Sequence, residues 1–135
     1  MPLHTKGLVH FTIPVTDLDR SEKFYTEIMG FKKVRRNPHM VFMRSGKDLF
    51  VLTKSEKPVD PNPGDDNAIH TAFLVDGTEY KTSLDFLKSK GIKIIQDEER
   101  RKGTFHGYSA YFHDPDRNVL EIIHLQNDPL SDTGE

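Results

Sequence analysis

Three side chains with metal-binding chemistry lie in strand-like runs of this sequence: His10, His70 and Glu121. Two neutral imidazoles and one carboxylate suit a divalent ion such as Fe2+, Mn2+, Zn2+, Ni2+ or Co2+. Three protein ligands leave coordination positions open for water or a substrate, and the same set forms the facial triad of non-haem iron oxygenases. The three residues stand in three separate strands, so their spacing alone does not show that they converge.

The residue types by themselves leave a second interpretation open. A carboxylate among apolar strand residues, as Glu121 is, costs several kcal/mol to bury unpaired. It therefore points to solvent, to a cation or to a metal. His10 and His70 have the same alternatives, because most histidines in folded proteins are solvated or hydrogen-bonded.

Composition limits the classes of function. The chain has 135 residues, which suits a single domain (1–135), and a formal net charge of −2, so no basic excess indicates a nucleic-acid partner. The absence of cysteine excludes disulfides, thiolate metal sites and cysteine nucleophiles. No apolar run approaches the roughly 20 residues of a membrane span, and the N-terminus lacks the apolar core of a signal peptide. We expect a cytoplasmic protein whose partner is a small molecule.

The chain reads as two halves with the same order of elements. Module one (about 8–53) has a strand at 8–15, a helix from a capping box at Asp19 to a stop at Gly30, and three strands. A loop rich in proline and acidic residues follows at 54–67. Module two (about 68–125) repeats the order, with a helix at 78–90. Its remaining strands are expected at 92–96, 106–113 and 118–125, and the charged run 98–102 is expected to be a solvated loop.

This order predicts an α+β fold of two βαβββ modules. One helix covers only one face of a four-stranded sheet. The other face must then be buried elsewhere or line a cavity. Two such sheets curving toward each other would form an eight-stranded, cleft-bearing arrangement, with polar residues of the inner face as the site.

Motifs across nearly the whole chain carry a family resemblance. The most specific is Tyr111–Glu121, which contains the turn Asp114-Pro115-Asp116-Arg117-Asn118. The others are Val9–Phe11, Asp17–Ser21 leading to Phe24-Tyr25 and Met29–Phe31, and Ile69–Phe73. On these motifs the sequence resembles the vicinal oxygen chelate superfamily, which includes glyoxalase I, extradiol dioxygenases, fosfomycin-resistance proteins and bleomycin-binding proteins. The family's usual turn has glycine where this chain has Arg117.

The resemblance implies metal ligands at His10, His70 and Glu121 and a divalent metal cofactor. It also implies a metal-dependent enzyme acting on a small molecule with neighbouring oxygens. Glyoxalase I usually adds a carboxylate in the last strand of module one, and 49–53 has none. Fosfomycin-resistance proteins often use an arginine shortly after the glutamate. This chain has none there, although Arg100, Arg101 and Lys102 could substitute.

These departures give extradiol dioxygenase-like chemistry a narrow preference. In that chemistry Tyr111 would donate a hydrogen bond to the substrate oxygen and His106 would move a proton. The alternatives are a fosfomycin-resistance-type transferase or hydrolase, a glyoxalase-like lyase or isomerase, and a metal-free, bleomycin-type binding protein.

We also expect a homodimer. Two helices leave part of eight strands uncovered unless a second subunit packs there. Relatives with two modules commonly pair modules from different chains, which would put His10 of one subunit beside His70 and Glu121 of the other.

Overall fold

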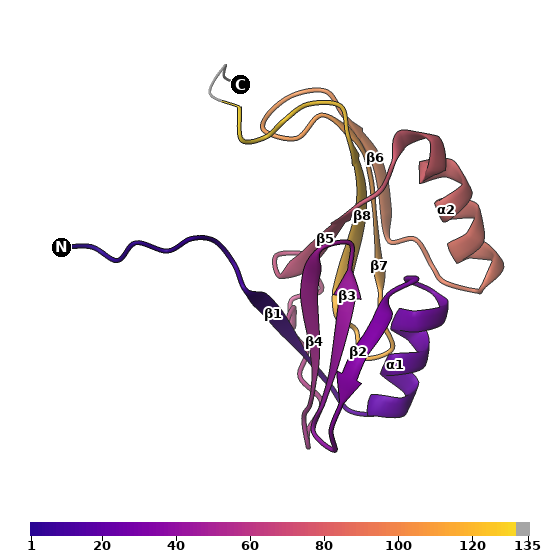
Figure 1. The fold of residues 1–135 in the computed structure, drawn as a ribbon. Helices are drawn as coiled ribbons and strands as arrows, with labels where there is room; N and C mark the ends of the chain where they lie inside the picture. Colours follow the sequence, from indigo (N-terminus) through magenta and orange to yellow (C-terminus); the bar gives the residue numbers. More distant parts are fainter. Residues whose placement is uncertain (132–135) are drawn as a thin grey trace. The chain divides into compact units, whose positions relative to one another are not determined.

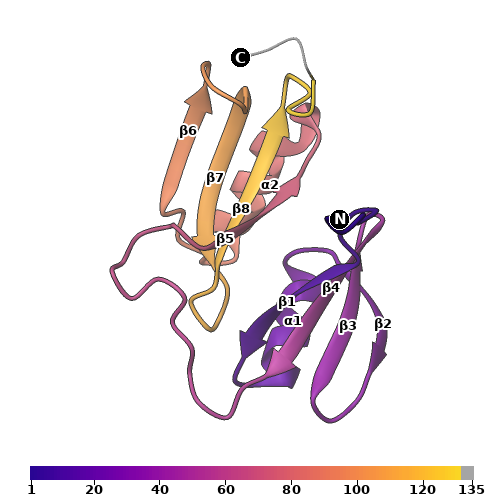
Figure 2. The ribbon, with the colours of Figure 1, turned by 90° about the vertical axis from the view of Figure 1, so that its left-hand side faces the viewer.

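The computed structural model describes residues 1–131, which divide into two compact units between Val59 and Asp60. The division falls inside the loop expected at 54–67. Each unit has the order strand, helix, three strands, which confirms the predicted pair of βαβββ modules (Figures 1 and 2). Neither helix within residues 1–131 has the length and apolar run that crossing a membrane requires.

The first unit is a four-stranded sheet with one helix. Its elements are β1 (His10–Val15), α1 (Leu18–Glu27), β2 (Lys32–Arg36), β3 (Met40–Ser45) and β4 (Asp48–Lys54). The strand order is β1-β4-β3-β2, with β1 parallel to β4 and the other pairs antiparallel. Pro14 lies in the edge strand β1, as expected for a residue that cannot donate to a ladder.

An aromatic cluster joins α1 to this sheet. The ring of Tyr25 lies 5.1 Å from that of Phe50 and 5.7 Å from that of Phe31, measured between ring centroids. Tyr25 and Phe50 are fully buried. The N-cap is Asp17, two residues before the predicted cap at Asp19, because the side chain of Asp17 accepts a hydrogen bond from Arg20 N at 3.0 Å.

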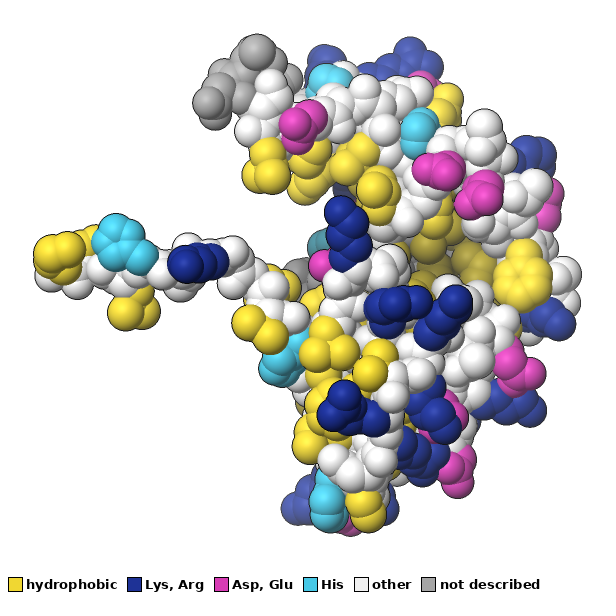
Figure 3. Space-filling model, in the orientation of Figure 1, with side chains coloured by type: hydrophobic (Ala, Val, Ile, Leu, Met, Phe, Trp, Pro, Cys, Tyr) yellow, Lys and Arg dark blue, Asp and Glu magenta, His cyan; other side chains and the backbone are white. Residues whose placement is uncertain are grey.

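The basic strand β2 forms ion pairs with α1. Toward α1, Lys33 lies 3.3 Å from Glu22, and Arg36 lies 2.9 Å from Glu22 and 2.8 Å from Asp19. All five residues of β2 are exposed, and in Figure 3 dark blue Lys and Arg side chains gather over this part of the unit. The ion pairs fix the edge strand against the helix.

The second unit repeats this topology. It contains β5 (His70–Leu74), α2 (Gly77–Ser89), β6 (Gln96–Arg100), β7 (Gly107–His113) and β8 (Val119–Leu125). The strand order is β5-β8-β7-β6, with β5 parallel to β8. The face of α2 predicted to be apolar is buried, with Tyr80, Leu84 and Leu87 all under a tenth exposed. We call the sheet face without α2 the open face of the second sheet.

The strand expected at 92–96 is displaced toward the C-terminus. β6 spans Gln96–Arg100, so the charged run predicted to be a loop instead supplies an edge strand. Its pairing with β7 is antiparallel, from Gln96 opposite Tyr111 to Arg100 opposite Gly107. Charged residues are tolerated because β6 lies at the sheet edge, where side chains reach water on at least one side.

Candidate metal centre

His70 and Glu121 meet on the open face of the second sheet. His70 opens β5, and Glu121 lies in the middle of β8, opposite Ala72 of the parallel partner strand. Residues two apart in a strand share a face, so the two side chains point the same way. His70 Nε2 lies 3.3 Å from Glu121 Oε1. Glu121 is only 4% exposed, so the sequence's expectation that this carboxylate needs a partner is met by an imidazole.

The hydrogen bonding of His70 decides which atom faces the carboxylate. His70 Nδ1 lies 2.7 Å from the carbonyl oxygen of Asn67, so Nδ1 must carry a proton. In a neutral ring Nε2 then presents a lone pair toward Glu121 Oε1, and two acceptors face each other. A cation between them, either a proton or a metal ion, is required for that contact to be favourable.

Tyr111 and Arg100 extend the cluster across the same face. Tyr111 lies opposite Glu121 on the neighbouring strand β7, and its ring centroid is 5.3 Å from that of His70, in an edge-on arrangement. Arg100 Nη2 donates to the Tyr111 hydroxyl at 3.0 Å, and its Nε donates to Ser109 Oγ at 3.4 Å. The guanidinium also lies 2.8 Å from Glu98 Oε1.

Burial and then the negative charge of Glu121 raise the pKa of Tyr111, against the opposing effect of the Arg100 guanidinium. The phenol therefore keeps its proton at neutral pH. It is a hydrogen-bond donor at the side of the His70–Glu121 pair. Of the basic residues that the sequence offered as an anion site, Arg100 contacts Tyr111 of this cluster, whereas Arg101 pairs with Glu99 at 2.9 Å.

The donor set fits a divalent ion. Two ligands about 2.1 Å from one ion lie roughly 3.0–3.4 Å apart when they subtend 90° to 109°. The Nε2–Oε1 distance of 3.3 Å falls in that range. The bond from Nδ1 to a backbone carbonyl is the outer contact that metal-bound histidines typically make. Residues 1–131 nevertheless contain no group of three or more His, Cys, Asp or Glu side chains placed to hold a metal.

The other two residues expected at the site are His10 and His106, and each has contacts within its own unit. His10 opens β1 in the first unit, where its Nδ1 lies 3.3 Å from Thr12 Oγ1. His106 precedes β7, with Nε2 2.9 Å from the Gly103 carbonyl and its backbone N–H bonded to Asn127 Oδ1. His106 is five residues from Tyr111, about 17 Å along an extended strand. A ligand role for His10 and a catalytic role for His106 stay predictions.

The family model for the Glyoxalase/Bleomycin resistance protein/Dioxygenase superfamily matches residues 7–122. The chain belongs to this superfamily.

Fosfomycin-resistance proteins are among the proteins to which this chain is similar. The chain is 25% identical over 118 residues to the fosfomycin resistance protein FosX of Listeria monocytogenes, covering 86% of this chain and 87% of FosX. It is 29% identical over 118 residues to the glutathione transferase FosA of Serratia marcescens, covering 87% of this chain and 79% of FosA. The crystal structure of L. monocytogenes FosX complexed with Mn(II) and sulfate superimposes with a TM-score of 0.76 at 20% identity, covering 93% and 95% of the two chains. That structural likeness confirms the fold.

Proposed function

We propose that this chain is a divalent-metal-dependent enzyme of the fosfomycin-resistance type, which opens the epoxide ring of a small phosphonate. The observation that carries the proposal is the Arg100 guanidinium beside Tyr111 and the His70–Glu121 pair. The sequence favoured ring-cleaving oxygenation only because no arginine follows Glu121. Arg100 supplies that cation from β6, and the similar proteins FosX and FosA support the same alternative.

His70 and Glu121 would hold the metal, with His10 as the third ligand. When bound, the metal acts as a Lewis acid toward a substrate oxygen. Arg100 binds the phosphonate, since a guanidinium matches two of its oxygens at once. Tyr111, neutral at physiological pH, donates a hydrogen bond to the substrate and orients it.

The reaction breaks one carbon–oxygen bond of the epoxide and forms one bond between carbon and the nucleophile. The nucleophile is water or a thiol, and its proton ends on the former ring oxygen. The chain has no cysteine, so a thiol nucleophile must come from a cosubstrate. No oxidant or reductant is needed.

Loss of fosfomycin, followed by 31P NMR with Mn2+ present, tests the proposal. One sample contains glutathione and the other only water. We expect turnover in one of them and none after the metal is chelated. A parallel anaerobic Fe2+ sample, given a catechol panel and then oxygen, distinguishes the ring-cleaving alternative. Oxygen uptake there, with intact fosfomycin in the Mn2+ samples, would contradict the proposal.

A further inference from the structure

Two residues at opposite ends of one ion pair have an unusual backbone conformation. Asp65 has φ 62° and Arg117 has φ 66°, and they are the non-glycine residues with positive φ within residues 1–131. Arg117 Nη2 lies 2.8 Å from Asp65 Oδ1, although the residues are 52 positions apart. Strain of this kind persists only where the surroundings enforce it, and it is concentrated at functional sites. Arg117 also replaces the glycine usual in this turn, which would adopt the conformation freely.

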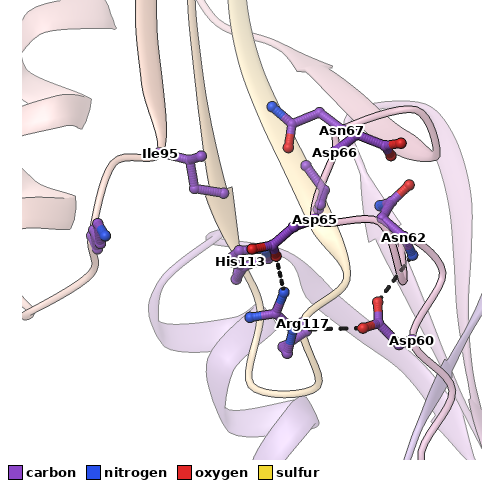
Figure 4. A pocket seen from close by; sticks show the side chains of 10 residues that line it. Asp60, Asn62, Asp65, Asp66, Asn67, Ile95, His113 and Arg117 are labelled. Carbon is purple, nitrogen blue, oxygen red and sulfur yellow. Dashed lines mark hydrogen bonds and ion pairs between the residues drawn. The ribbon is translucent and has the colours of Figure 1, made fainter.

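The ion pair holds the tip of a closed loop. The side chain of Asn62, buried to 5% exposure, accepts from Ile69 N at 2.8 Å and donates to Ile69 O at 2.9 Å. This closes residues 62–69 into a loop just before β5, with Asp65 at its far end. In Figure 4 Arg117 lies between Asp65 and Asp60, at the edge of a cavity of about 320 Å3. Its Nε is 3.9 Å from Asp60 Oδ2.

The same loop carries the atom that orients His70. Asn67, two residues beyond Asp65, accepts the hydrogen bond from His70 Nδ1 at 2.7 Å. On the other side, His70 pairs with Val119 of β8, two residues beyond Arg117. The ion pair therefore joins the two chain segments that lead into the His70 site.

We propose that Arg117 and Asp65 are positioning residues, which fix the 62–69 loop so that the Asn67 carbonyl holds His70 with Nε2 directed at Glu121. They act through Asn67 and touch neither the metal nor the substrate. The consequence for metal affinity rests on the proposed function, whereas the consequence for the His70 ring does not.

The test replaces Arg117 with glycine in the full chain. Loss of outer contacts to a ligating histidine typically lowers metal affinity about 10–100-fold. We expect Mn2+ affinity, measured by calorimetry, to fall at least about tenfold in Arg117→Gly. The thermal midpoint should stay level or rise, because glycine removes the backbone strain. The 15N signals of the His70 ring should move toward the tautomer protonated at Nε2. Arg117→Lys, which keeps the cation, should restore both the Mn2+ affinity and the His70 ring signals.

Arg101→Gly is the matched control. It also replaces an arginine of the second unit with glycine, at a position whose side chain is 78% exposed. It should leave the Mn2+ affinity and the His70 ring signals unchanged. Unchanged His70 ring signals in Arg117→Gly would overturn the proposal, as would Mn2+ affinity equal to that of the unmodified protein. If the unmodified chain binds no Mn2+, the proposed function fails, and the ring signals alone decide the role of Arg117.

Discussion

Replacing Arg100 with glutamine separates its proposed contact with substrate from its contribution to stability. In the free protein the side chain bonds to Tyr111, Ser109 and Glu98. The Glu98 pair is about one-third exposed on each side, at 31% and 33% of the side chains, so solvent screens it to at most about 1 kcal/mol. That loss lowers the thermal midpoint by roughly 3–6 °C in a chain of this size.

The expected effect on catalysis is larger. A hydrogen bond to a charged group contributes about 1.5–3 kcal/mol. Its loss corresponds to a fall in kcat/KM for fosfomycin of about 10–150-fold. The proposed contact with the phosphonate is the same in the ground state and in the transition state, so we expect KM to rise while kcat changes little.

Arg101→Gln is the matched control, because it removes the neighbouring arginine, which pairs with exposed Glu99. It should change kcat/KM less than about twofold, the range expected of a surface substitution. An Arg100→Gln protein with the parent's KM, or an equal loss in Arg101→Gln, would refute the reasoning.

Three further predictions concern the fold, the pH response and the subunits. Gly107→Ala should lower the free energy of unfolding, measured in urea, by about 2–5 kcal/mol. Gly107 has a φ of 146°, and a Cβ at this position would overlap the His124 carbonyl. Burial and then Arg117 lower the pKa of His113. As pH drops, the unfolded chain therefore takes up this proton before the folded chain does, and the free energy of unfolding falls below about pH 6.5. His113→Gln should reduce the difference in free energy of unfolding between pH 7.5 and pH 5.5. We expect a homodimer in sedimentation. If ligands are shared between subunits, each heterodimer formed by mixing His10→Ala with Glu121→Ala protein should regain one of its two Mn2+ sites, and no recovery would exclude sharing.

The repeated order of elements could be predicted because each helix has a clear stop and an apolar stripe. Gly30 and Gly91 both adopt positive φ just beyond their helices, as the sequence indicated. Tyr80, Leu84 and Leu87 face the core as their spacing predicts. The sequence also indicated that Glu121 needs solvent or a partner, and the structure places His70 Nε2 3.3 Å from its Oε1.

Pairing between distant segments could not be predicted in the same way. β6 forms from charged residues because its ladder with β7 is set by backbone hydrogen bonds, which residue types do not reveal. The assignment of Arg100 to the site depends on that shift. The Arg117–Asp65 contact spans 52 residues, and only the unusual arginine in the turn gave any signal of it.

The central claim is that His70 and Glu121 hold a divalent metal. The most direct measurement is Mn2+ stoichiometry in carefully purified protein, compared with His70→Ala and Glu121→Ala, with near-UV circular dichroism recorded on each. We predict one ion per chain in the parent and none in either variant, with native spectra throughout. Full Mn2+ occupancy in both folded variants would contradict the account.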